Sequence, residues 1–238
     1  MNLHNILFLD IESVPERENF NELSNIKKEL FAKKTEYQRK ADDIAPKDFY
    51  QRAGIWAEFG KIVCISVGFF TTENKEQKFR VTSFYGDEKE LLLAFKELLD
   101  THFNKPEKLL CAHNGKEFDF PFIARRMIIK GITLPEKLNL FGKKPWEVAH
   151  LDTLDLWKFG DYKHYTSLQL LTNILDIPSP KDDINGSQVA EVFYKEKDLK
   201  RIVAYCEKDT IAVAQLLLRY QNKPILSEKD IKLIEKDN

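Results

Sequence analysis

NILFLDIE, residues 5–12, joins a run of apolar side chains directly to two acids, Asp10 and Glu12. A continuous apolar run is typical of a strand buried on both faces in the middle of a sheet. Residues two apart on a strand point to the same face, so both carboxylates should project together from its carboxyl end. Taken alone the pair is ambiguous, because two solvated acids at a surface strand end have the same pattern.

Strand and helix patterns alternate along the rest of the chain. Runs rich in Val, Ile and Phe predict further strands, at residues 61–70, 78–85, 108–113 and 150–157, the last of which can also run into a helix. Apolar residues at helical spacing predict helices, at residues 88–103, 122–131, 167–175, 187–194 and 199–220. Strands early and helices late, with alternation between them, predict one α/β fold with five strands.

Residues 18–52 differ from their surroundings, because Lys and Glu dominate there and apolar positions recur at helical spacing. We expect a charged helical insert at about residues 18–52 within a single domain that spans residues 1–222. Residues 223–238 are short and charged, and we expect them to form a C-terminal tail.

The overall composition restricts the classes of partner. The formal net charge is −1, from 37 basic and 38 acidic residues, whereas proteins that coat nucleic acid carry a basic excess. No apolar stretch approaches the length of a membrane span, so we expect no membrane contact. Cys64, Cys111 and Cys206 form no C-x-x-C motif and predict buried free thiols, which suit a cytoplasmic location.

Two more acidic motifs follow strand and helix patterns. NGKEFD, residues 114–119, comes after a strand, and Asp119 stands at the start of the next helix, where it can also be a simple N-cap. YCEKD, residues 205–209, lies in the last long helix, where Tyr205 and Asp209 share one face. A hydrogen bond between this Tyr and this Asp in the core is the alternative for that pair.

The combination of the three motifs is more specific than any one of them. At ~5 Å and an effective dielectric constant of ~20, each pair of like charges costs about 3 kcal/mol. Divalent cations would remove this repulsion among four converging carboxylates. Ligation by oxygen alone selects Mg²⁺ or Mn²⁺ over zinc.

FLDIE, HNGKEFD and YCEKD, in that order, resemble the three exonuclease motifs of the DEDD superfamily in its tyrosine-bearing branch. The chain is most similar to stand-alone bacterial proteins that resemble the exonuclease domain of family-B DNA polymerases. The likeness runs from about residue 5 to residue 220 and includes WAEFGKIVCIS and DTLDLW. It implies a ribonuclease H-like fold, with a mixed five-stranded sheet flanked by helices, and 3′→5′ exonuclease activity. The charged insert departs from the short connection that the superfamily has there.

The resemblance also implies roles for individual residues. Asp10, Glu12, Asp119 and Asp209 would hold two divalent cations, Mg²⁺ or Mn²⁺, and Asp10 would bridge both. Tyr205 would orient the attacking water. The expected contacts with the substrate strand are Asn114, Phe118 and Ser13, where Ser13 replaces the Thr of many relatives and Phe118 either stacks on a base or belongs to the core.

Several other polar residues each have two interpretations. Asp152 either faces the site or caps a helix, and His113 is expected to be structural. Two groups of residues either bind phosphate or are simply exposed to solvent. One group is Arg125, Arg126 and Lys130, and the other is Lys163, His164 and Ser167.

The expected substrate is the 3′ end of single-stranded DNA or RNA, with DNA favoured, and DNA replication or repair proteins are the candidate partners. A ribonuclease H-type endonuclease shares the acids and the fold, but Tyr205 favours the exonuclease. A nucleic-acid-binding module without activity is the alternative from another class. G-x-S-x-G, P-loop and H-E-x-x-H motifs are absent from the sequence.

Overall fold

A mixed sheet with the strand order β5-β4-β1-β2-β3-β6 forms the centre of the computed structural model, which describes residues 1–161, 163, 165–178 and 184–234. The strands are β1 Ile6–Pro15, β2 Gly60–Glu73, β3 Glu76–Tyr85, β4 Leu109–Ala112, β5 Leu151–Asp152 and β6 Ile231–Leu233. The α-helices are α1 Asn25–Lys34, α2 Glu36–Lys40, α3 Pro46–Phe49, α4 Glu88–His102, α5 Asp119–Ile129, α6 Thr153–Lys158, α7 Leu168–Ile174, α8 Val189–Glu191 and α9 Leu199–Tyr220. None of the described helices is both long and apolar enough to cross a bilayer.

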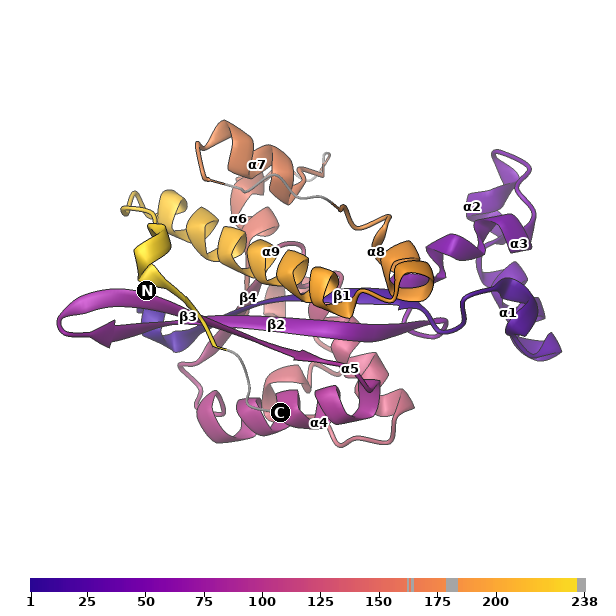
Figure 1. Ribbon diagram of the computed structural model, residues 1–238, viewed down its shortest axis with the longest axis horizontal. Coiled ribbons are helices and arrows are strands. Elements are labelled where there is room, and N and C mark those ends of the chain that lie inside the picture. The colour runs from indigo at the N-terminus through magenta and orange to yellow at the C-terminus, as the bar shows by residue number, and fades with distance from the viewer. Residues whose placement is uncertain (162, 164, 179–183, 235–238) are drawn as a thin grey trace.

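Helices cover both faces of the sheet, with α9 on one face and α4 and α5 on the other (Figure 1). The alternation of side chains along β1 divides the core accordingly. Leu7 and Leu9 pack into the cluster with α4 and α5, whereas Ile6 and Phe8 pack into the cluster with α9. Strand β1 is therefore apolar on both sides, as a central strand must be.

The pairing of β1 with β2 and β4 determines where along the sheet Asp10 and Glu12 lie. β1 is antiparallel to β2 and parallel to β4, with Phe8 opposite Cys111. Because parallel strands end at the same edge, Asp10 lies level with the turn that follows β4. A register shift against β2 falls between Glu12 and Ser13, directly after the two acids.

The sheet has six strands, so the expected number of five is wrong by one. The additional strand is β6, which pairs in parallel with β3, with Phe79 opposite Ile231. The segment between α9 and β6 is anchored to α9, because the side chain of Gln215 hydrogen bonds with both the N–H and the carbonyl of Leu226. β6 has only three residues in a charged segment, which is too short for a strand pattern to be recognised in the sequence. These residues form a strand because they pair with β3.

Residues 18–52 contain α1, α2 and α3, at one end of the sheet (Figure 1). An aromatic cluster around Phe31 of α1, with Phe20, Phe49, Tyr50, Trp56 and Phe59, packs α1 against α3 and the residues that follow it. The chain directly after this segment is tied to β1, because the hydroxyl of Ser13 donates to the Gly54 carbonyl at 2.8 Å.

One buried carboxylate joins the end of β5 to the turn after β4. Oδ1 of Asp152 accepts hydrogen bonds from the backbone N–H groups of Asn114 and Leu154, both at 2.9 Å. Its Oδ2 accepts from the N–H of Lys116 at 3.0 Å. Asp152 is therefore the N-cap of α6 and at the same time the support of the turn that leads into α5.

His150, directly before β5, is neutral and links this strand to β4 and to Lys137. Its Nε2 donates to the Lys137 carbonyl at 2.7 Å, and its Nδ1 accepts from the N–H of Leu110 at 3.2 Å. Both ring nitrogens are used, so a second ring proton would break the bond with Leu110. Burial lowers the pKa of His150 from 6.5 to about 4.

We expect Asp152→Ala to lower the free energy of unfolding by about 3 kcal/mol, because buried N–H groups lose a charged acceptor. Urea denaturation measures the loss. The matched control is Asp87→Ala at the exposed N-cap of α4, where the carboxylate accepts from the N–H groups of Lys89 and Glu90. That cap should contribute about 1 kcal/mol, and equal losses for the two variants would contradict the role given to Asp152.

His150 should make the protein less stable as the pH falls from 6.5 to about 4. The unfolded chain takes up the proton near pH 6.5 and the folded chain only near pH 4, so protonation favours unfolding within this window. The full contribution is about 3 kcal/mol. Urea denaturation at several pH values should give a shallower pH dependence for His150→Gln than for the native protein. His102→Gln, at an exposed position, is the control, and an unchanged dependence in His150→Gln refutes the assignment.

Candidate active site

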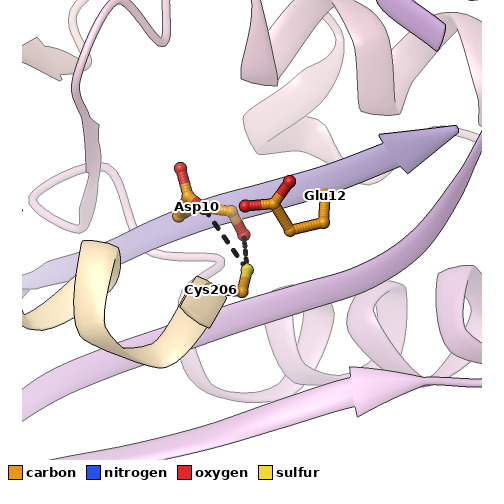
Figure 2. Close-up of side chains that lie close together, drawn as sticks. All are labelled: Asp10, Glu12 and Cys206. Carbon is orange, nitrogen blue, oxygen red and sulfur yellow. Dashed lines mark hydrogen bonds between the residues drawn. The ribbon is translucent and has the colours of Figure 1, made fainter. Parts of the chain in front are cut away.

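Asp10 and Glu12 lie on the face of β1 that α9 covers, because they continue the register of Ile6 and Phe8. One carboxylate oxygen from each and the thiol sulfur of Cys206 lie within 4.8 Å of one another. Figure 2 shows the two carboxylates side by side on β1 and the thiol reaching Asp10 from α9. Cys206 Sγ donates to Asp10 Oδ2 at 3.3 Å and to the Asp10 carbonyl at 3.4 Å.

Burial and mutual repulsion disfavour the charged forms of both acids. Burial raises the pKa of Asp10 well above its usual range, and the charges of Glu12, Asp209 and Asp119 raise it further. The pKa of Glu12 is also well above its usual range, from burial first and then from the charges around it, Asp209 and Asp119 among them. All four acids of the predicted set therefore interact electrostatically, although their chain positions are far apart.

Asp119 reaches the site as the first residue of α5. The turn before it has a left-handed residue, Asn114, at φ 62°, and a close approach at Gly115, where an added Cβ would lie 2.5 Å from the Cβ of Ala112. Burial raises the pKa of Asp119 to about 8, although backbone hydrogen bonds, one of them with Ile11, lower it in part. The hydrogen bond with the backbone of Ile11 thus holds this carboxylate of α5 against β1.

Helix α9 supplies the remaining members of the site. The inward face of α9 includes Ile202, Cys206 and Thr210, which are fully buried, and Tyr205 and Asp209 flank this face and are half-buried. Burial raises the pKa of Tyr205 far above its usual value, and the charge of Asp209 adds to the shift. A hydrogen bond with the Asp209 side chain also favours the neutral phenol.

The acids open on one side into a cavity of about 740 Å³. Asp10, Tyr205 and Asp209 line it, together with side chains from α7 and from the segments on either side of α7. The site is therefore accessible from solvent and has space beside it for a ligand.

None of the three expected substrate contacts is among the described residues that line the cavity. The hydroxyl of Ser13 donates to the carbonyl of Gly54, which follows the insert in the sequence. The backbone of Asn114 is held by Asp152. The ring of Phe118 packs on Phe122, with 5.3 Å between the ring centroids, and against the core.

Two of the basic residues considered for phosphate binding pair with a carboxylate away from the site. Arg126 is buried and binds Glu88 on the far side of the sheet, and Lys130 binds the same carboxylate. Neither of the two interpretations of Arg126, phosphate binding or solvent exposure, is therefore correct. Ser167 is the N-cap of α7, Lys163 is exposed, and His164 lies outside the described residues.

Two neighbours of the acids were missed in the sequence. Cys206 was expected as a buried thiol, and it is one, but its position directly after Tyr205 on an amphipathic helix also places it under β1. Tyr165 approaches the acids from the loop before α7, and the charges of Asp119 and Asp209 act on its hydroxyl. No sequence motif includes Tyr165, because only the folding of this loop over His113 brings it close.

Residues 55–231 match the model of a family described as a predicted 3′→5′ exonuclease related to the exonuclease domain of PolB. The matched part includes Asp119, Tyr205 and Asp209, and Asp10 and Glu12 precede it. No curated protein matches the chain in sequence.

Among solved structures, the chain is similar to the family B DNA polymerase from the hyperthermophilic archaeon Pyrobaculum calidifontis, with 17% sequence identity and a TM-score of 0.53. The likeness covers 90% of this chain and 24% of the polymerase. It shows the fold, a ribonuclease H-like arrangement of a mixed sheet flanked by helices. By the match over most of its length, the chain belongs to the family of predicted 3′→5′ exonucleases related to the exonuclease domain of PolB.

Proposed function

We propose that this protein removes nucleotides from the 3′ end of single-stranded DNA by metal-dependent hydrolysis. The observation that carries the proposal is the buried cluster of carboxylates beside an open cavity. Burial and mutual repulsion raise the pKa values of Asp10, Glu12 and Asp119. Groups with strongly shifted pKa values in a cleft are candidates for catalysis.

The donor set suits hard divalent cations. Asp10, Glu12, Asp119 and Asp209 offer carboxylate oxygens, which Mg²⁺ and Mn²⁺ prefer. The same four side chains would hold two such ions, whose positive charge offsets the repulsion among them. Two bound cations would supply Lewis acidity, lowering the pKa of an attacking water and stabilising charge on the leaving 3′ oxygen.

The side chains around the acids orient and exclude water. Tyr205 stays protonated, because burial and the charge of Asp209 raise its pKa, so its hydroxyl acts as a positioning group and not as a base. Cys206 holds Asp10 through the thiol hydrogen bond. Apolar residues of the α9 face keep bulk water from the back of the site, which strengthens the electrostatic interactions within it.

The substrate is inferred from the family. The family is related to the exonuclease domain of a DNA polymerase, which favours DNA over RNA. We propose residues 1–222 as the exonuclease domain, with the helices of residues 18–52 inserted in it.

We expect the protein to shorten a 5′-labelled single-stranded oligonucleotide one nucleotide at a time with Mg²⁺ or Mn²⁺, and EDTA should stop the reaction. Glu12→Ala and Asp119→Ala should each lower kcat/KM at least about 100-fold, because several kcal/mol of charge stabilisation is lost. Gel ladders on matched DNA and RNA oligonucleotides report direction and sugar preference together.

Glu97→Ala, at an exposed position on α4, is the matched control and should keep the native rate. A covalently closed single-stranded circle separates the two nuclease classes, since only an endonuclease cuts it. Binding of the oligonucleotide without hydrolysis by native protein and metal would instead favour a binding module. Either Glu12→Ala or Asp119→Ala with most of its rate retained would refute the site.

Metal binding should also be visible without activity. We expect Mg²⁺ to raise the melting temperature of the native protein, because the cation relieves repulsion that only the folded state experiences. Replacing Asp10 and Asp209 together by Asn should remove most of this increase. Differential scanning calorimetry with and without EDTA measures it, and an increase of native size in the double variant would show that the cation binds elsewhere.

A further inference from the structure

Helix α9 covers two apolar clusters on the sheet, and polar residues lie between them. Val213, late in α9, packs in the cluster that contains Phe8 of β1. Ile202, early in α9, packs in the cluster that contains Val14 of β1. Between these positions β1 carries its two acids, and α9 carries the YCEKD motif. The contact between helix and sheet therefore changes from apolar to polar and back along its length.

Three strands supply the polar residues on the sheet side of this contact. Asp10 of β1 lies opposite Ser66 of β2, and Ser66 lies opposite Ser83 of β3. Both serines are buried, and their hydroxyl oxygens are 2.8 Å apart. The sulfur of Cys64, two residues before Ser66 on β2, lies 3.6 Å from the Ser66 hydroxyl. Residues two apart on a strand share a face, so these side chains line up beneath α9.

Two successive residues of α9 bind the ends of this row. The hydroxyl of Ser83 donates to Oε1 of Glu207 at 2.7 Å. At the other end, the thiol of Cys206 donates to Oδ2 of Asp10 at 3.3 Å (Figure 2) and also forms a hydrogen bond with the Cys64 side chain. Hydroxyls and thiols thus form a continuous hydrogen-bonded chain between the carboxylates of Glu207 and Asp10.

The bonds along this chain have fixed directions, because a hydroxyl or thiol has one proton to donate. Ser83 donates to Glu207, so Ser66 donates to Ser83. The buried hydroxyl of Thr210 adds a contact with β2, because it shares its proton between the Ser66 carbonyl at 3.3 Å and the Cys206 carbonyl at 3.0 Å. Removal of one member leaves a buried neighbour unpaired, which costs more than the bond itself contributes. The chain therefore favours one position of α9 over nearby alternatives.

We propose that this hydrogen-bonded chain sets the position of α9 on the sheet, and that Ser66, Ser83 and Glu207 are positioning residues that align Asp209 with Asp10. The inference rests on the proposed exonuclease function, because it concerns the alignment of the acids that this function uses. Apolar packing is non-directional and tolerates a small slide of the helix. Buried hydrogen bonds fix one arrangement, because each member must meet its own partner.

The anchored residues of α9 are next to the residues that the proposed reaction needs. Tyr205 directly precedes Cys206, and Asp209 follows Glu207 by two residues. A helix rises about 1.5 Å per residue, so a slide of α9 by one residue would separate Asp209 from the acids of β1 by a comparable distance. A misplacement of about 1 Å in an active site can cost about 100-fold in rate. Small errors in the position of this helix would therefore be visible in kcat.

The first test measures kcat and KM on a single-stranded oligonucleotide at saturating Mg²⁺. Ser66→Ala and Ser83→Ala should each lower kcat about tenfold and change KM less than about twofold, because the acids are misaligned while the surface that binds the strand is untouched. Glu207 separates the hydrogen bond from the charge. Glu207→Gln keeps an acceptor oxygen and should retain most of kcat, whereas Glu207→Ala should lose about as much as Ser83→Ala.

Two other hydroxyls provide matched controls. Thr82→Val, next to Ser83 on β3, removes a buried hydroxyl that has no hydrogen-bond partner among the described residues, and it should keep the native kcat. Thr35→Val removes a fully buried hydroxyl that donates to the Phe31 carbonyl at 2.8 Å, and it should lower the melting temperature without lowering kcat.

Three kinetic results would overturn the proposal. The first is a native kcat in both Ser66→Ala and Ser83→Ala. The second is a loss in Thr35→Val as large as theirs, because a general loss of stability would then explain all of them. The third is an equal loss in Glu207→Gln and Glu207→Ala, which would assign the effect to charge. Circular dichroism at the assay temperature verifies that each variant is folded.

Hydrogen exchange of backbone amides, followed by mass spectrometry, separates this proposal from the proposed function because it requires no activity. In a Ser66→Ala, Ser83→Ala double variant, the amides of residues 205–209 should exchange about tenfold faster than in the native protein, the size expected for lost buried hydrogen bonds. The amides of α4, on the other face of the sheet, should exchange at the native rate. Faster exchange at residues 205–209 in a protein that hydrolyses no substrate counts against the exonuclease alone. Unchanged exchange there overturns the positioning role, whether or not the protein is active.

Discussion

The structure depends on β1, a buried apolar strand that also carries two acids, Asp10 and Glu12. The strand is covered by helices on both faces, and its first residues supply side chains to two separate hydrophobic clusters. The same alternation then directs Asp10 and Glu12 under α9, where water is largely excluded. Like charges in such a place cost several kcal/mol of stability. The two acids keep this position because β1 is paired with a strand on each side and packed between helices, which fixes the direction in which their side chains point.

On the opposite face of the sheet, a buried acid that we assign no chemical role is neutralised by basic partners. Glu88 at the start of α4 is bound by Arg126 and Lys130 and also accepts from the N–H of Ile62. Burial alone would raise its pKa, but these partners outweigh burial and lower it. Among the described residues that most strongly shift the pKa values of Asp10, Glu12 and Asp119, none is basic. This contrast between two buried acidic sites in one molecule supports a ligand-binding role for the second.

Much of this arrangement could be predicted from sequence, because strong periodicity determined it. The limits of α9, Leu199–Tyr220, match the pattern at residues 199–220, and the period of two in β1 places its acids on one face. What could not be predicted depends on long-range contacts. Strand β6 exists only by pairing with β3, Arg126 is buried only because Glu88 faces it, and Tyr165 reaches the acids only through the support of His113.

The parallel pairing of β6 with β3 has a consequence for behaviour in concentrated solution. Strand β3 would otherwise lie at the border of the sheet, with a row of amide and carbonyl groups along Phe79, Arg80 and Val81 open to another chain. Such borders promote intermolecular strand addition and aggregation. The three residues of β6 occupy that row, and the ion pairs of Lys232 with Glu73 and of Asp230 with Lys78 fasten them. The sheet then ends in a strand of three residues with charged flanks, which is a weaker template for another chain than β3 would be.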